Sequence, residues 1–314
     1  MMKKLGNFGI VCLVAIATVL IVSFSVDAKR KKPKHNRNTV ERVDNNYHGN
    51  RNVESSKSRN VVQNKPGNIK PDSYGNVKPV SSESSALTDV KVNSKYSNVT
   101  KRYTAMTVNF NPSYRVPNCV SYVLTSDMID VTNGPNSERR RNYKFYADPS
   151  VSGCPEWYEY KGSGYDRGHM APANDMRWSR QSMSDCFLMT NICPQDHDLN
   201  GGSWNKLELT VHDWAKHYGK IIVATGPIFN GSSQRIGKNN DIVVPSGFFK
   251  VVLDPSRNLA IGFIYDNHEG GGGVARHACS VDDVERITGH DFFSSLPDNV
   301  ERQVESTCSF NQWN

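Results

Sequence analysis

The 314-residue chain lacks long hydrophobic runs beyond its N-terminus. One apolar stretch, about residues 8–26, has the length of a membrane span, so a protein with several spans is excluded. No C-x2-C pair occurs, and a tetrahedral zinc site therefore has no support from cysteine spacing. No internal repeat is present. Aromatic residues make up 10% of the chain, with five Trp among them, which excludes a wholly disordered protein.

The excess of positive charge is missing from the larger, C-terminal part of the chain. Lys and Arg exceed Asp and Glu by 38 − 31 = +7 overall. Residues 29–95 hold 15 basic and 6 acidic side chains (+9), whereas residues 96–314 hold 21 and 24 (−3). The first segment also lacks Phe, Trp and Cys, so it cannot bury enough apolar surface to offset chain entropy. We therefore expect a disordered basic linker over residues 29–98, either a tether for polyanions or a solubilising spacer.

The N-terminus has the pattern of a targeting segment. Lys3 and Lys4 precede the apolar stretch, which ends near the small residue Ala28. This order predicts a secretory signal over residues 1–28 and a secreted or extracytoplasmic protein. The apolar stretch is long for a signal, and a basic cluster at residues 29–32 follows it. An uncleaved membrane anchor or surface retention therefore stays open as the alternative, and a membrane contact is expected only in that case.

Six cysteines remain after the targeting segment. An even number in an exported chain predicts up to three disulfides, with no connectivity specified. Cys186 and Cys193 flank the strand-like residues 187–192 and, if extended, lie about 23 Å apart, beyond the roughly 7 Å Cα separation of a disulfide. We expect that these two do not pair. The six are Cys119, Cys154, Cys186, Cys193, Cys279 and Cys308.

From residue 99 onward the chain reads as one α+β domain, residues 99–314. Four apolar, β-branched runs bounded by turn residues predict strands. They cover residues 119–124, 220–225, 248–253 and 259–265. Helical spacing of apolar residues predicts a helix over residues 203–218 that Gly219 ends. A shorter helix is expected over residues 281–288, with Ser280 as N-cap and Gly289 after its last residue.

Polar residues in unusual positions concentrate between residues 141 and 208. Glu208 lies on the core-facing stripe of the first predicted helix, where a carboxylate is seldom found without a partner. It is either one half of a buried ion pair with an Arg or a carboxylate held for metal or water chemistry. Asn200 precedes the same helix, and taken alone it would most often be a helix cap.

The segment Asp166-Arg167-Gly168-His169 packs an acid, a base and an imidazole into four residues. A lone His is more often structural than catalytic. Phosphodiester hydrolysis, however, needs a general base, a hard cation on the phosphate and a positive charge for the developing anion. His169, Asn200 and Arg167 have the chemistry to supply these three functions.

This segment resembles the DRGH signature of the DNA/RNA non-specific endonuclease family. Further blocks follow in the family's order over about residues 100–314. They comprise Thr190-Asn191-Ile192, Pro194-Gln195, Asn200, Trp204, Leu207-Glu208, residues 224–229 and residues 245–250. One departure is Cys119, which stands where the family often has an aromatic residue. That position affects packing or a disulfide and not the site.

The resemblance implies a ββα-metal nuclease fold, in which a mixed, mainly antiparallel sheet is flanked by helices. By motif position, His169 would be the general base that activates water. Asn200 would be the direct protein ligand of Mg²⁺, with Mn²⁺ or another divalent ion as alternatives. Glu208 would orient the water shell of the metal, and Asp166 would orient the structure behind the site. Arg167 would stabilise the developing charge.

Asn191 and Gln195 would support the site, and Arg141 would bind the substrate phosphate. The resemblance implies an exported endonuclease that cuts DNA and RNA with little sequence preference, because phosphate contacts carry no sequence information. A homodimer is an open expectation. The alternative is a non-catalytic nucleic-acid or cell-surface binding protein that uses the basic linker. The presence of all four residues His169, Asn200, Glu208 and Arg167 argues against that alternative. With an unperturbed imidazole pKa of about 6.5, the rate should fall below pH 6.

Overall fold

The computed structural model describes residues 77–78, 80–268 and 271–313, which belong to one compact unit of the chain. The expected signal segment and residues 29–76 of the expected linker lie outside the described residues. Within the described residues, no helix has the length and apolar character needed to cross a membrane.

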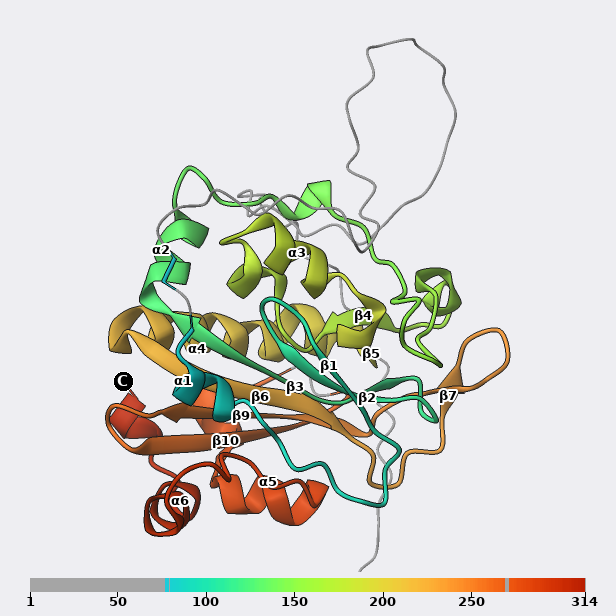
Figure 1. Ribbon diagram of the computed structural model, residues 1–314. Helices are drawn as coiled ribbons and strands as arrows, with labels where there is room; N and C mark the ends of the chain where they lie inside the picture. The colour runs from blue at the N-terminus through green and yellow to red at the C-terminus, as the bar shows by residue number, and fades with distance from the viewer. Residues whose placement is uncertain (1–76, 79, 269–270, 314) are drawn as a thin grey trace, which may run out of the picture. The chain divides into compact units, whose positions relative to one another are not determined.

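The central element of the described residues is a seven-stranded sheet in the order β1-β2-β3-β6-β9-β10-β11 (Figure 1). Every pair of neighbouring strands in it is antiparallel. Two further pairs, β4–β5 and β7–β8, form small separate ribbons. The strands are β1 Val99–Arg102, β2 Thr107–Asn111, β3 Val116–Thr125, β4 Asp166–His169, β5 Ile192–Gln195, β6 Lys220–Ile228, β7 Arg235–Ile236, β8 Ile242–Val243, β9 Gly247–Asp254, β10 Leu259–Asp266 and β11 Ala278–Cys279.

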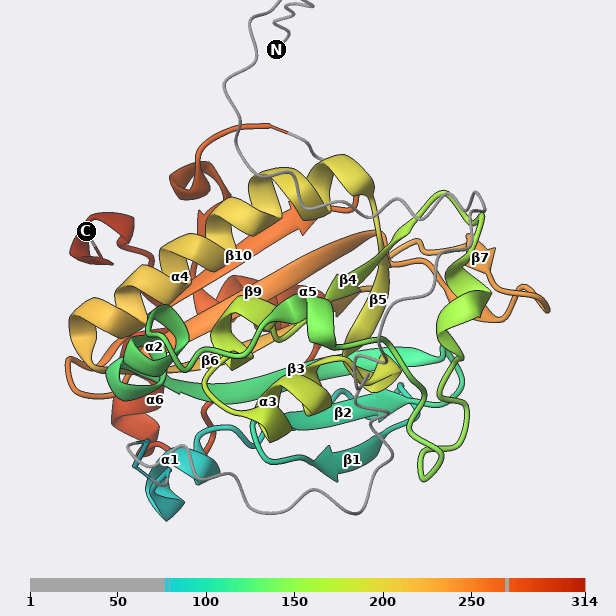
Figure 2. The same ribbon diagram turned by 90° about the horizontal axis from the view of Figure 1, so that it is seen from above.

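Helices cover both faces of this sheet. Figure 1 shows α2, α3 and α4 with the β4–β5 ribbon on one face, and α5 and α6 on the other. Figure 2 shows α4 running along the strands across the first face. The α-helices are α1 Ser82–Ala86, α2 Ser126–Asn133, α3 Arg180–Cys186, α4 Trp204–Tyr218, α5 Val281–Thr288 and α6 Asp298–Glu305. The predicted α+β class, with a mainly antiparallel sheet flanked by helices, is confirmed.

Shorter helical turns join these elements. One of them, Leu199–Ser203, is a π turn that leads directly into α4. The 3-10 turns are Arg140–Asn142, Trp157–Tyr160, Ala173–Met176, Met189–Asn191, Val274–His277 and Phe310–Trp313.

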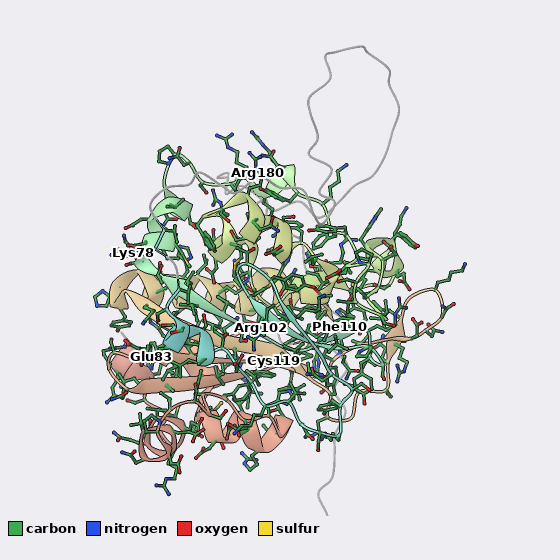
Figure 3. All side chains as sticks on the ribbon, in the orientation of Figure 1. Lys78, Glu83, Arg102, Phe110, Cys119 and Arg180 are labelled. Carbon is green, nitrogen blue, oxygen red and sulfur yellow. The ribbon has the colours of Figure 1, made fainter. Side chains whose placement is uncertain are left out.

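Two hydrophobic cores, one on each face of the sheet, explain why the central strands have continuous apolar sequences. In β3, Val120 and Tyr122 belong to the core beneath α4, whereas Cys119 and Val123 belong to the core beneath α5 and α6. Side chains of a strand alternate between the two faces, so a strand buried on both faces has no solvent-facing positions and is mostly apolar. Figure 3 shows Phe110 of β2 and Cys119 of β3 within this packed sheet. All four predicted strands are present, in β3, β6, β9 and β10.

Both predicted helices are present, and their ends have local causes. Helix α4 stops at Gly219, whose φ of +84° favours glycine. Helix α5 begins after Ser280, whose side chain accepts a hydrogen bond from the Asp283 backbone N–H. It ends at Gly289, which has a left-handed φ of +68°.

Two local expectations were wrong. Residues 187–192 do not form a strand, because α3 runs to Cys186 and a 3-10 turn at Met189–Asn191 precedes β5. All six cysteines of the described domain are free, so the expected disulfides are absent. Three of them serve as small apolar core residues, which is a frequent use of free cysteine. These three are Cys119, Cys186 and Cys193.

Residues 80–98, which we placed in the disordered linker, include ordered structure. Ser81 caps α1 by accepting a hydrogen bond from the Ser84 backbone N–H. Ser121 of β3 donates a hydrogen bond to the Thr88 carbonyl oxygen, and Lys91 forms a β-bridge with Asp291. The expectation of disorder used the average composition of residues 29–95. That average did not distinguish the packed residues 80–95 from the rest of the segment.

Candidate active site

The residues singled out from the sequence gather on a strand–strand–helix unit. Strands β4 and β5 pair antiparallel, with Asp166 opposite Gln195 and His169 opposite Ile192. The π turn containing Asn200 follows β5 and leads into α4, which carries Glu208. The two strands lie side by side in Figure 2. This is the ββα arrangement that the family resemblance implied.

Gly168 allows the two strands of this unit to approach closely around Gln195. A Cβ atom at Gly168 would lie 2.2 Å from Gln195 Oε1 and 2.6 Å from Gln195 Cβ. Gln195 is fully buried, and its side-chain amide has no hydrogen-bond partner among the described residues. Its contact with the Gly168 backbone makes it a packing residue behind the site.

His169 ends β4 in an aromatic environment. Its ring centroid lies 5.2 Å from that of Phe145 and 5.1 Å from that of Phe187, and the residue is 6% exposed. Burial, together with the positive charges of Arg140 and Arg167, holds the pKa of His169 well below its usual range. The imidazole is therefore neutral at physiological pH. Its Nε2 atom is buried and has no hydrogen-bond partner among the described residues.

Two arginines lie on the aromatic residues that surround His169. The Arg167 guanidinium is 4.9 Å from the Phe145 ring centroid, and its Nη1 donates a 3.3 Å hydrogen bond to the Trp157 carbonyl. The Arg140 guanidinium lies 5.6 Å from the ring centroid of Phe187. Both are cation–π contacts that hold a positive charge close to the imidazole.

The structure brings Arg140, and not the predicted Arg141, to this site. The charge of Arg140 acts on both His169 and Glu208. Arg141 is exposed in the same 3-10 turn. The sequence contains three consecutive arginines at positions 139–141, and spacing alone did not distinguish which of them lies close to His169.

Asn200 is oriented by Asp166. Asn200 Nδ2 donates a 2.9 Å hydrogen bond to Asp166 Oδ2, and His197 Nδ1 lies 3.0 Å from the same oxygen. Because the amide nitrogen is engaged, the amide oxygen is the atom of Asn200 that can face a cation. The hydrogen bond to Asp166 raises the pKa of His197. Sequence reasoning missed His197, although its position between two aspartates shortly before Asn200 was a usable signal.

Asn191 joins the two loops that leave β4 and α3. Its Oδ1 accepts a 2.9 Å hydrogen bond from the Ala171 backbone N–H, and its Nδ2 donates to the carbonyl oxygens of Ala171 and Cys186. Asn191 is fully buried. Its side chain therefore fixes the backbone shortly after His169.

Glu208 lies among charged groups beneath the site, and no described arginine forms an ion pair with it. Burial raises its pKa, and the positive charges of Lys250 and Arg140 oppose this shift. Lys250 is fully buried, with its Nζ 4.9 Å from the Trp204 ring centroid and no hydrogen-bond partner among the described residues. Asp175 contributes a further negative charge. Lys250 was missed, because in the sequence it lies within an apolar strand.

The chain is similar to known nucleases over most of the described residues. A profile of the DNA/RNA non-specific endonuclease family matches residues 83–299. The mitochondrial nuclease EXOG of Mus musculus is 31% identical over 232 residues, which cover 67% of this chain and 60% of that protein. A nuclease of Nostoc sp. is 30% identical over 219 residues, covering 63% of this chain and 74% of that protein. The chain spans 58–63% of the length of three EXOG proteins that it matches.

A solved structure has the same fold. The crystal structure of the EndoG/EndoGI complex aligns with a TM-score of 0.57 and 26% sequence identity. The alignment covers 63% of this chain and 86% of the matched chain.

The relatives correct the expected location. EXOG, endonuclease G and nuclease 1 of Schizosaccharomyces pombe are named as mitochondrial proteins. This finding contradicts the expectation of a secreted or surface-retained protein. Basic residues before an apolar stretch mark a targeting segment, but they do not specify which membrane receives it.

The predicted family is confirmed by the profile, by the relatives and by the structural similarity. The DRGH residues of β4, Asn200 of the π turn and Glu208 of α4 all lie within the matched range. The chain belongs to the DNA/RNA non-specific endonuclease family.

Proposed function

We propose that this protein is a metal-dependent endonuclease that hydrolyses phosphodiester bonds of DNA and RNA with little sequence preference. The observation that carries the proposal is the environment of the His169 imidazole: its charge, its hydrogen bonding and its neighbours. Its imidazole is neutral, its Nε2 has no hydrogen-bond partner among the described residues, and two guanidinium groups flank its aromatic surroundings. A neutral imidazole accepts a proton from water, and nearby positive charge stabilises the anionic phosphorane that follows.

The donor set around Asn200 fits a hard divalent cation. An amide oxygen held by the Asp166 hydrogen bond, with a carboxylate beside it, is the oxygen chemistry that Mg²⁺ prefers. Asn200 would hold the ion directly, and Glu208 would orient its water. The ion, when bound, polarises the phosphoryl oxygen and neutralises charge. Asp166 keeps the Asn200 side chain in one orientation.

Low sequence preference follows from the kind of contacts that the site offers. Four exposed basic side chains stand in the stretch that contains Arg140, and guanidinium and ammonium groups contact phosphates without reading bases. These four are Arg139, Arg140, Arg141 and Lys144.

The activity is tested by incubating the full chain with supercoiled plasmid and with single-stranded RNA. With Mg²⁺ the proposal predicts degradation of both substrates to short products without discrete sequence-specific bands. EDTA should stop both reactions, and added Mg²⁺ should restore them. Binding of both nucleic acids without cleavage under all metal conditions would instead support the non-catalytic alternative.

A further inference from the structure

A cluster of carboxylates lies on the face of the sheet opposite α4. Asp282 and Glu285 are on α5, and Glu305 is the last residue of α6. One carboxylate oxygen from each of the three lies within 4.8 Å of those of the other two. Helices α5 and α6 pack against each other beneath the sheet (Figure 1). The cluster therefore bridges α5 and α6, which both also pack against β10.

Glu305 distinguishes this cluster from an ordinary acidic surface. It is 6% exposed, and its Oε1 has no hydrogen-bond partner among the described residues. A buried carboxylate without a partner is strongly disfavoured unless it is protonated or bound to a cation. Glu285 already uses Oε1 to accept a 2.8 Å hydrogen bond from the Phe292 backbone N–H, which fixes its position and leaves Oε2 for another ligand.

The charge around the cluster is strongly negative. Asp291 and Glu301 add two carboxylates that act on Glu285 and Glu305. Lys91 is bound to Asp291 at 2.9 Å. Burial and this mutual repulsion raise the pKa of Glu285 to about 7 and that of Glu305 to about 8.

We propose that Asp282, Glu285 and Glu305 form a structural Ca²⁺ site that joins α5 to α6. Oxygen ligands of Ca²⁺ lie about 2.3–2.6 Å from the ion, so two ligand oxygens can be separated by at most roughly twice that distance. The three carboxylate oxygens lie within 4.8 Å of one another and can therefore share one ion. Asp282 is exposed, which leaves room for the water molecules that complete six to eight ligands. The site is distinct from Asn200, which lies on the other face of the sheet.

Thermal unfolding of the full chain, with and without Ca²⁺ at pH 8, tests this site. Saturating Ca²⁺ should raise the Tm by about 3 °C or more, because a ligand that binds only the folded state stabilises it. Glu305→Gln keeps the shape of the side chain and should remove this rise. Asp282→Asn changes an exposed residue and should weaken Ca²⁺ binding, measured calorimetrically, by about tenfold or more.

Two control variants separate this site from other cation effects. Asp298→Asn removes a negative charge from α6, the helix that carries Glu305, at a position outside the cluster. This variant should keep the rise of Tm with Ca²⁺. Asn200→Ala should also keep it, which excludes Ca²⁺ binding at the candidate active site as the cause. A Tm that rises on acidification and does not respond to Ca²⁺ would overturn the proposal. That result would show that protons bound to the carboxylates, and not a cation, neutralise the cluster. An equal Ca²⁺ response in Glu305→Gln would overturn it as well.

Discussion

Phe145 and Phe187 contribute to the burial that lowers the pKa of His169. Their rings exclude water from an imidazole that is 6% exposed, and the loss of hydration disfavours the charged form. The expectation of a rate falling below pH 6 used an unperturbed pKa and therefore needs correction. Because the pKa of His169 is lowered, the neutral base persists below pH 6.

Replacing Phe145 with Ala should raise the pKa of His169 toward about 6.5. The substitution admits water to one face of the imidazole and also removes the ring between it and Arg167. An NMR titration of the histidine side chains measures this pKa directly. Trp157→Ala is a control, because the Trp157 side chain is exposed and the hydrogen bond from Arg167 goes to the backbone carbonyl oxygen, which the substitution keeps. A pKa of His169 near 6.5 in the parent protein would contradict the account.

Asn200→Ala should raise the Mg²⁺ concentration needed for half-maximal activity, because the substitution removes the proposed ligand. Asp166→Ala should shift the requirement in the same direction, because it removes the acceptor of the 2.9 Å hydrogen bond that orients the Asn200 amide. The measurement is a Mg²⁺ titration of the cleavage rate. Asn205→Ala, an exposed position on α4, is the matched control. A lower Tm with an unchanged Mg²⁺ requirement would show that Asn200 only caps the helix.

At the scale of elements, the long strands and helices were predictable and the β4–β5 ribbon was not. Strand β3 and helix α4 carry local apolar patterns that neighbouring elements do not change. Strands β4 and β5 have four residues each, contain charged and polar side chains, and pair across 22 intervening residues. Their pairing depends on the close approach of Gly168 to Gln195. The spacing of apolar residues along the sequence does not reveal such a contact. Only the family resemblance anticipated this unit.

Gly168→Ala should destabilise the protein by about 1–3 kcal/mol, since the added Cβ would overlap Gln195 unless the two strands separate. For a domain of this size each kcal/mol lowers the Tm by about 2–4 °C. Thermal unfolding measures the effect. Gly273→Ala is the control, because nothing lies within 4 Å of a Cβ atom at that position. Equal Tm values for the two variants would contradict the close approach of β4 and β5.

At the scale of the whole molecule, a sheet buried on both faces separates two regions with different chemistry. The α4 face carries His169, Asn200 and Glu208, with arginines beside them. The α5–α6 face carries the carboxylate cluster. Residue identities and their order suggested the first region, and the family resemblance assigned its residues. The proximity of Arg140 to His169, the buried Lys250 and the second region depend on three-dimensional contacts between residues distant in the sequence.

The most direct test of the account is the single-turnover cleavage rate of His169→Ala, measured with saturating Mg²⁺ and compared with the parent protein. Loss of a general base lowers a rate by about 10²–10⁴-fold. We predict a decrease in this range, while the affinity for nucleic acid and the Tm stay close to those of the parent. Cleavage within threefold of the parent rate, by a folded variant that binds nucleic acid normally, would contradict the role of His169.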